Sequence, residues 1–277
     1  MPYDPTIYQG AAPHYLRGRP RYSAELVPTF RRELGLDGHG RLLDVGCGPG
    51  VLAVDLAGLF DEVVGLDPDA AMLAEGARRA EAEGVGNVRW VRAVAEDIPG
   101  LGLGPLALAT FGQSFQWMER ERVAEAVYDL LVPGASLVCV VHSVEGRPVP
   151  EGPDHPPIPH DEIAALVDRY LGPRRRAGQG FTRRPPDRYE DALARTRFGA
   201  ARFVFAPGRP DVVRDVDSIV AGVHSLSWAA PHLFGDRMAA FDAELRDLLL
   251  RHASDGRFRD WPGDTELVIA TKSNKGT

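Results

Sequence analysis

The sequence has little cysteine and no long hydrophobic run. Cysteine occurs twice in 277 residues, which is too few for a disulfide framework and gives no metal-ligand spacing. No apolar run approaches the length of a membrane-spanning helix, and the first residues do not resemble a signal peptide. We therefore expect a reduced, cytoplasmic protein with no metal site and no membrane contact.

Lysine is nearly absent as well, because it occurs only at Lys272 and Lys275. The net charge is −7, whereas a nucleic-acid-binding protein needs a basic face that displaces counterions. We expect no nucleic-acid partner. The basic stretch of residues 174–176 and 183–184 is interpreted either as a solvated loop face or as an anion-binding lid.

The most informative segment is residues 42–50, LLDVGCGPG. An apolar run ends in Asp44, glycines follow at positions 46, 48 and 50, and residues 51–56 begin a helix. Glycines let a ligand lie against bare backbone, and a helix N-terminus offers unpaired N–H groups. This order predicts a nucleotide-like ligand between a strand and a helix.

Two details indicate which ligand it is. A dinucleotide-binding loop places a third small residue where this chain has Val51. Asp44 would repel a pyrophosphate but suits a cation. The segment closely resembles the first motif of class I S-adenosylmethionine-dependent methyltransferases. The resemblance implies that S-adenosylmethionine is bound, that S-adenosylhomocysteine is the product, and that Gly46, Gly48 and Gly50 contact the ligand.

Strands and helices alternate after this loop, which predicts an α/β fold with a parallel sheet. The resemblance implies a Rossmann-like, seven-stranded mixed sheet with helices on both faces and an antiparallel last strand. An N-terminal helix is expected over 23–34, and it starts late or kinks at Pro28. The expected strands are residues 62–66, 88–91, 105–111, 136–141, 201–206 and 266–271. The other expected helices are residues 69–80, 121–132, 161–171, 187–196, 215–227 and 237–252.

Three parts are expected along the chain. Residues 1–40 form an N-terminal cap helix, and residues 41–143 with 200–277 form the methyltransferase core. Residues 144–199 form an inserted helical lid that helps to bind the acceptor. The first part of this lid is too rich in proline to join the sheet. We expect the lid to be the least stable part of the fold.

Carboxylates and backbone at the next strand ends complete the expected donor site. Asp67, followed by Pro68, closes the second strand and suits two ribose hydroxyls, a feature that dinucleotide enzymes share. Residues 92–99 resemble the adenine-contacting motif, but Val94 stands where the family commonly has Asp, Asn or Ser. Adenine recognition therefore shifts to the backbone of Ala95 and to the side chain of Glu96 or Asp97.

Two further segments resemble family elements around the donor. Residues 110–118 resemble the floor of the acceptor pocket. Thr110 and Gln113 are expected to contact the cofactor, and Gln116 is another candidate for hydrogen bonding in the pocket. Trp117 is expected to pack rather than to take part in catalysis. Residues 19–22 resemble an element that folds over the cosubstrate. Tyr15 or Arg19 is expected to meet its carboxylate.

The candidate general base is His142, at the end of the fifth expected strand. His224 and Tyr15 follow it, and a structural role is the alternative for each histidine. Residues 218–228, which include His224, are similar to a segment that borders the acceptor site in the trans-aconitate methyltransferase-like branch. A base is needed only if the acceptor arrives protonated.

The favoured function is methyl transfer from S-adenosylmethionine to an oxygen or nitrogen of a small-molecule acceptor, by a monomer or homodimer. One alternative is a protein that binds S-adenosylmethionine or S-adenosylhomocysteine without methyl transfer. A nicotinamide-dependent oxidoreductase is less favoured, because the sequence contains no Tyr-x-x-x-Lys pair.

Overall fold

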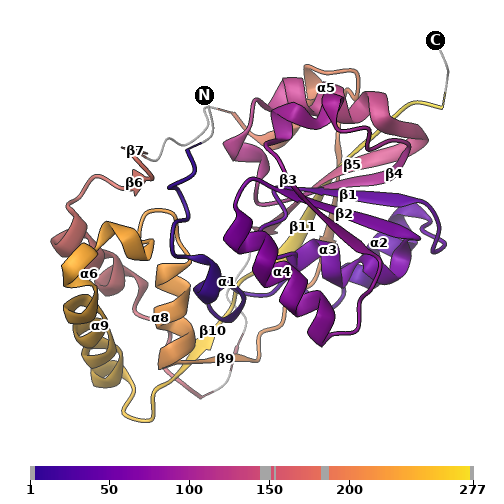
Figure 1. Cartoon of the computed structure of the whole chain (residues 1–277). Coiled ribbons are helices and arrows are strands. Elements are labelled where there is room, and N and C mark those ends of the chain that lie inside the picture. The colour runs from indigo at the N-terminus through magenta and orange to yellow at the C-terminus, as the bar shows by residue number, and fades with distance from the viewer. Residues whose placement is uncertain (1–3, 144–150, 153, 182–186, 275–277) are drawn as a thin grey trace.

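Figure 1 shows the computed structural model, which describes residues 4–143, 151–152, 154–181 and 187–274. The elements gather in two groups. A sheet flanked by helices forms one group, and helices α6, α8 and α9 form the other, with α1 between them. We call these groups the sheet lobe and the helical lobe.

The sheet has seven strands in the order β3-β2-β1-β4-β5-β11-β8. Neighbouring strands from β3 to β5 are parallel, and β11 is antiparallel to both of its neighbours. The predicted seven-stranded mixed sheet with an antiparallel last strand is therefore confirmed. The strands are β1 (Arg41–Val45), β2 (Glu62–Asp67), β3 (Val88–Arg92), β4 (Leu106–Gly112), β5 (Leu131–Ser143), β8 (Arg202–Ala206) and β11 (Asp264–Thr271).

Two hydrophobic clusters cover the two faces of the sheet. Leu43 and Leu42 of β1 point to opposite faces, as alternate residues of a strand do. Leu43 packs in the cluster that includes α5 and α7, and Leu42 packs in the cluster that includes α2 and α3. The helices of this lobe are α2 (Leu26–Leu34), α3 (Val51–Asp55), α4 (Ala70–Ala82), α5 (Arg120–Leu130) and α7 (Tyr189–Ala194), with short 3₁₀ helices η1 (Ala57–Leu59), η2 (Ala95–Gly100) and η3 (Phe115–Trp117).

One helix boundary differs from the prediction and another agrees with it. Helix α5 ends at Leu130 rather than 132, because Leu131 already pairs with Leu106, and Pro133 lies where the register shifts, a place that tolerates proline. Helix α2 starts late, so that Pro28 falls in its first turn, as predicted. In α4, Gly76 is buried, whereas Ala77 is exposed.

The helical lobe has a hydrophobic cluster of its own. Helices α6 (His160–Leu171), α8 (Val216–His224) and α9 (Met238–His252) pack together around Phe241. A two-stranded ribbon of β9 (Val212–Asp215) and β10 (Arg257–Asp260), together with η4 (Pro231–Leu233) and η5 (Gly235–Arg237), completes it. Helix α1 (Ala12–Gly18) contacts both α8 and α4 and so joins the two lobes.

This packing groups the elements differently from the predicted ranges. Helix α7 lies within the predicted lid 144–199 but packs in the sheet lobe. Helices α8 and α9 lie within the predicted core 200–277 but pack with α6. Of the predicted lid, residues 144–150, 153 and 182–186 lie outside the described residues. The division into domains stays a prediction.

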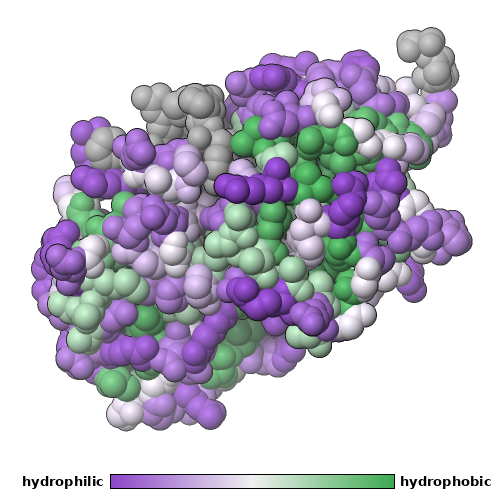
Figure 2. All heavy atoms as spheres, in the orientation of Figure 1, coloured by the Kyte–Doolittle hydropathy of each residue, from purple (hydrophilic) through white to green (hydrophobic). Residues whose placement is uncertain are grey.

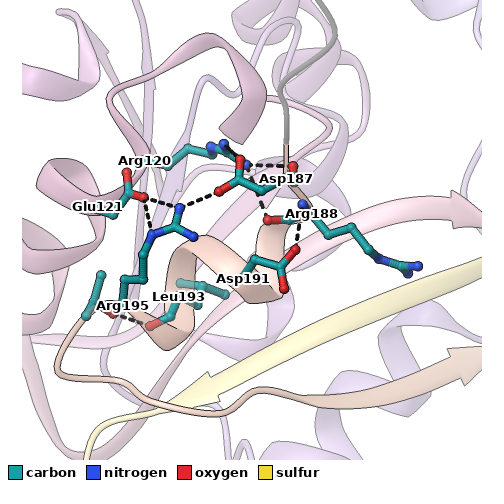
Figure 3. A network of polar contacts seen from close by, with 8 residues as sticks. Arg120, Glu121, Asp187, Arg188, Asp191, Leu193 and Arg195 are labelled. Atoms are coloured by element: carbon teal, nitrogen blue, oxygen red, sulfur yellow. Dashed lines mark hydrogen bonds and ion pairs between the residues drawn. The ribbon is translucent and has the colours of Figure 1, made fainter.

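An ion-pair network holds the start of α7 against α5 (Figure 3). Arg120, whose side chain is 10% exposed, pairs with Asp187. Arg195 pairs with Asp187 and with Glu121, so Asp187 is shared between two guanidinium groups. Hydrogen bonds from the two arginines hold the pKa of Asp187 below its usual range. The network therefore attaches α7 to the sheet lobe.

A short hairpin ties another part of the predicted lid to the N-terminal segment. Strand β6 (Arg176–Ala177) pairs with β7 (Gly180–Phe181). At the turn between them the backbone N–H of Gln179 donates to Asp4 over 2.7 Å. Residues 176–181, expected as a loop, thus form an anchored hairpin.

The surface is mixed in character. On the face seen in Figure 2, hydrophilic residues surround small hydrophobic patches. Within the described part of the chain, every helix is too short or too polar to cross a bilayer.

Candidate functional site

The loop between β1 and α3 is built from glycines in left-handed backbone conformations. Gly46, Gly48 and Gly50 have φ angles of 64°, 52° and 72°, which other residues rarely adopt. A Cβ atom on Gly46 would lie 2.6 Å from the Cβ of Ser114, whereas one on Gly48 would meet nothing within 4 Å. Gly48 therefore presents bare backbone to open space.

Gly50 serves packing instead of the ligand. The indole ring of Trp90 lies so close that Cβ atoms added to Gly50, Gly65 and Gly76 would come within 2.4, 2.8 and 2.6 Å of it. Glycines of the loop, of β2 and of α4 together make room for this ring.

We expect Gly50→Ala to destabilise the protein by about 1–3 kcal/mol, because a methyl group would add a clash to a strained positive φ. Thermal unfolding of the variant measures this. Gly58→Ala is the matched control, because a Cβ atom there meets nothing within 4 Å and no positive φ is needed. Equal melting temperatures for the two variants would contradict the packing role.

Arg79 of α4 holds the loop from behind. Its guanidinium donates to the carbonyl oxygens of Gly50 and Val51 over 3.1 and 3.3 Å and pairs with Asp55. The side chain is only 8% exposed. These bonds fix the junction of loop and helix, so that the Gly48 backbone has a defined position.

Asp44 lies one residue before the end of β1, and only 1% of the residue is exposed. Its two oxygens accept hydrogen bonds from the Thr110 hydroxyl over 2.8 Å and from the Ala53 N–H over 3.2 Å. Burial raises the pKa of Asp44 to about 7, and these two bonds oppose that rise. A nearby cation would stabilise its charged form.

Asp67 ends β2 on the other side of the loop. One oxygen accepts from the Gly48 N–H over 2.8 Å and the other from the Asp69 N–H over 2.9 Å. Burial raises the pKa of Asp67 to about 6, against the effect of these bonds. Asp69 caps α4 by accepting from the N–H groups of Ala71 and Met72.

Two adjoining cavities open beside the loop. The first cavity lies over β2 and η2 and is bordered by Asp67, Pro68, Ala95 and Glu96, with apolar walls from Met72 and other side chains. The second cavity lies over β1 and β5 and is bordered by Asp44, Arg19 and His142. Both are lined by Tyr15, Gly46, Gly48, Gly112 and Gln113.

The N-terminal segment covers these cavities. Tyr8 lies edge-on to Tyr15 and to Trp117, at 6.4 and 6.1 Å between ring centroids. The guanidinium of Arg19 lies 5.1 Å from the centroid of the Tyr15 ring and donates to the Ser225 carbonyl over 2.9 Å. Its buried Nε atom has no hydrogen-bond partner. Arg19 therefore brings an unused donor to the second cavity.

His142 stands at the carboxyl end of β5 with its ring stacked on Tyr22, at 4.9 Å between centroids. Burial lowers the pKa of His142, against the effect of a hydrogen bond with the Pro20 backbone. Its Nδ1 atom has no partner. Burial raises the pKa of Tyr22 well above its usual value. The ring of His142 is thus neutral at neutral pH and has a free nitrogen, whereas Tyr22 stays protonated.

Comparison with known proteins identifies the family. A family model described as a methyltransferase domain matches residues 42–134. The 2-heptyl-1-hydroxyquinolin-4(1H)-one methyltransferase of Mycobacteroides abscessus is 30% identical over 169 residues, which cover 59% of this chain and 73% of that protein. The chain belongs to the class I S-adenosylmethionine-dependent methyltransferases. It is therefore a methyl-transferring enzyme.

Other relatives of this methyltransferase match over smaller fractions of both chains. Methyltransferase cfoB of Aspergillus candidus is 29% identical over 148 residues, 50% of this chain and 44% of that protein. An RNA methyltransferase of Thermosynechococcus vestitus is 31% identical over 90 residues, 32% of this chain but only 20% of that protein. The chain thus spans less than half of these two relatives.

Solved structures show the same fold. A chain from Anaeromyxobacter dehalogenans assigned as a type II methyltransferase has a TM-score of 0.50 at 21% identity, covering 94% of this chain and 99% of its own. The [4+2]-cyclase SpnF has a TM-score of 0.52 at 17% identity, covering 98% of this chain and 96% of its own.

Several predicted site residues of the methyltransferase lie outside both cavities, and the adenine candidate Asp97 is among them. Gly50 packs on Trp90, and Thr110 is fully buried and donates to Asp44. His224 is fully buried in the helical lobe, where its Nε2 atom lies 2.6 Å from the Asp242 carboxylate. We do not retain His224 as a candidate base, because its ring packs among Phe234 and Phe241.

Two polar candidates are partly engaged by the protein itself. Glu96 accepts from the Glu119 N–H over 3.0 Å. Gln116 lies outside both cavities, donates to the Gln113 carbonyl over 2.6 Å and accepts from Tyr189. Gln113 has a φ of 53°, unusual for a residue with a side chain. The chain therefore holds Gln113 in a strained conformation between the cavities.

The sequence interpretation missed several residues that line the cavities. Tyr22 and Met72 lie in segments that carried a signal, because Tyr22 ends the 19–22 element and Met72 lies in the helix predicted over residues 69–80. Ile7 and Tyr8 carried none. They reach the first cavity only through the path of the N-terminal segment.

Proposed function

We propose that this methyltransferase uses S-adenosylmethionine as its methyl donor and an oxygen or nitrogen of a small molecule as its acceptor. The observation that carries the proposal is the pair of buried carboxylates, Asp44 and Asp67, on either side of the open backbone of Gly48. The Asp44 carboxylate disfavours a dinucleotide pyrophosphate. The two carboxylates suit a ligand that has a cationic centre and a ribose.

The residues present fit this donor. Open space at Gly48 admits a ligand against the backbone, and the unpartnered Nε of Arg19 suits a carboxylate. We assign the ribose to Asp67, the adenine to Pro68, Ala95 and the side of Met72, and the amino-acid tail to the region of Asp44, Tyr15 and Arg19. When bound, the donor supplies a methyl group on a positively charged sulfur, which is a good leaving group.

The chain itself then needs to orient the partners and exclude water. Tyr8 and Tyr15 lie over the cavities and shield them. His142, neutral and with one free ring nitrogen, is placed to accept a proton from an acceptor hydroxyl. An amine acceptor that arrives unprotonated would not need this step.

The net charge of the chain and its similarity to other methyltransferases favour a small-molecule acceptor over RNA. The chain carries a net charge of −7, which opposes binding to RNA. The RNA methyltransferase relative matches a fifth of its own length, over 90 residues, whereas the relative with the larger share acts on a quinolone. Cytoplasmic location and a monomeric or homodimeric state stay predictions.

Incubating the protein with S-adenosylmethionine labelled in the methyl group and a cell extract tests the proposal. A labelled small molecule is the expected result. Label in RNA would contradict the acceptor class. Binding of S-adenosylhomocysteine without any labelled product would support the alternative of a binding protein.

We expect Asp67→Asn to weaken S-adenosylhomocysteine binding by about 1–3 kcal/mol, because the amide loses a charge-assisted acceptor. Isothermal titration calorimetry measures the affinity. Asp61→Asn is the control, because Asp61 is an exposed carboxylate that accepts from the Gly40 N–H before the opposite end of β2. Tighter binding of NAD than of S-adenosylhomocysteine would overturn the donor assignment.

A further inference from the structure

A third cavity lies within the helical lobe and adjoins the second cavity. It is formed where α6, α8 and the end of α1 meet, and it shares Arg19, Pro20 and Pro262 with the second cavity. Its volume is about 530 Å³, within the range of pockets that hold drug-sized molecules. We call it the lobe cavity.

The wall of the lobe cavity is largely apolar and contains two indole rings. Trp228 follows α8 and Trp261 follows β10, and both side chains are half-buried. The guanidinium of Arg175 lies over the Trp228 ring at 4.2 Å and adds another flat surface. The aliphatic part of the wall comes from Ile158, Ile163, Ile219 and Val223.

The three arginines on this wall each contact other groups of the protein. Arg214 pairs with Asp260 at 3.1 Å, each side chain being 12% exposed, and also donates to the Gly18 carbonyl over 2.8 Å. Arg19 uses one nitrogen on the Ser225 carbonyl. Asp161 adds a negative charge. Because Arg214 is neutralised by Asp260 and Asp161 adds a negative charge, the apolar residues of the described wall favour an apolar ligand over one with several carboxylates.

We propose that the lobe cavity binds the acceptor and that the acceptor is a planar, largely apolar aromatic molecule that carries a hydroxyl group. This inference rests on the proposed function. Flat aromatic walls favour flat ligands through dispersion and stacking. The hydroxyl end passes Pro20 and Pro262 into the second cavity, where His142 stands.

The reaction at that point is balanced. The acceptor oxygen forms a bond to the methyl carbon as the carbon–sulfur bond breaks, and the electron pair of that bond stays on sulfur. The hydroxyl proton goes to His142 and then to solvent. The products are an aryl methyl ether, S-adenosylhomocysteine and one proton.

Equilibrium dialysis on the full-length protein saturated with S-adenosylhomocysteine tests the inference. The probes are 2-naphthol, which is planar and apolar, and trans-aconitate, a small tricarboxylate. We expect 2-naphthol to bind at least about tenfold more tightly than trans-aconitate. Trp228→Ala should weaken 2-naphthol binding by about fivefold or more, and the affinity for S-adenosylhomocysteine should not change.

Trp261→Ala is a second variant, and retained S-adenosylhomocysteine binding shows that each variant is folded. Phe203→Ala is the matched control, because Phe203 of β8 is an exposed aromatic residue that lines none of the three cavities; it should leave 2-naphthol binding unchanged. Unaltered 2-naphthol binding in both lobe-cavity variants, or a preference for trans-aconitate, would overturn this inference and leave the proposed function standing. Failure of the wild-type protein to bind S-adenosylhomocysteine would instead overturn the proposed function.

Discussion

His142→Ala is expected to lower turnover of a hydroxyl acceptor by roughly 10²–10⁴-fold and to leave S-adenosylhomocysteine affinity unchanged. The ring stacks on Tyr22 in the second cavity, and its Nδ1 atom has no protein partner. Removing it therefore removes a proton acceptor without removing a contact of the donor. Steady-state kinetics with labelled donor, alongside calorimetry, separates the two effects.

The pH profile gives an independent check on His142. Burial lowers the pKa of His142, so the neutral form that accepts a proton is already present at neutral pH. At saturating donor, we expect kcat/KM for the acceptor to rise with pH below the ordinary histidine pKa of about 6.5 and then to level off. His39→Ala is the control, because the His39 side chain is 78% exposed. An unchanged rate in His142→Ala would leave catalysis to proximity alone.

Asp44→Asn is expected to weaken binding of S-adenosylmethionine by about 2–5 kcal/mol, because it removes a buried charge beside a cationic ligand. Asparagine keeps the size of the side chain and can still accept a hydrogen bond from the Thr110 hydroxyl. The loss should therefore exceed that of Asp67→Asn. Calorimetry at pH 8 measures it, where the carboxylate of the wild-type protein is ionised.

The raised pKa of Asp44 makes this effect depend on pH. The folded pKa is about 7 and the ordinary value is 3.8, so between these values the folded protein holds a proton that the unfolded chain has lost. Stability of the ligand-free protein should fall as pH rises through this window, by up to about 1.4 kcal/mol per pH unit, and level off above it.

Donor affinity should change in the opposite direction. As pH rises through about 7, Asp44 becomes negative and attracts the cation more strongly. Asp67, with a pKa of about 6, adds to this rise at lower pH. Asp44→Asn should remove the change near pH 7 both from the stability of the ligand-free protein and from the donor affinity. An affinity that is flat from pH 5.5 to 8.5 in the wild-type protein would contradict the charge argument.

Local patterns in the sequence determined most of the sheet lobe and its glycine loop. Strand, carboxylate, glycines and helix follow one another in residues 42–56, and each step is set by neighbours in the chain. The same holds for Asp69 at the start of α4 and for the late start of α2 at Pro28. Such features depend on backbone preferences and short-range hydrogen bonds, so a single sequence is enough to predict them.

The path of the chain between elements was decided only by tertiary structure. The sequence could not show that Tyr8 covers the first cavity, because long-range packing of α1 on α8 and α4 places it there. The sequence also could not show that Asp242, eighteen residues away, lies against His224 and holds it inside the helical lobe.

The same reason explains the grouping of the helices. Helices α6, α7, α8 and α9 all carry an amphipathic pattern, and such a pattern shows that a helix buries one face but not against which partner. The shared carboxylate of Asp187 attaches α7 to α5. The aromatic cluster around Phe241 gathers the other three helices. Local sequence patterns thus determined where helices form, whereas contacts between side chains far apart in the chain determined which helices pack together.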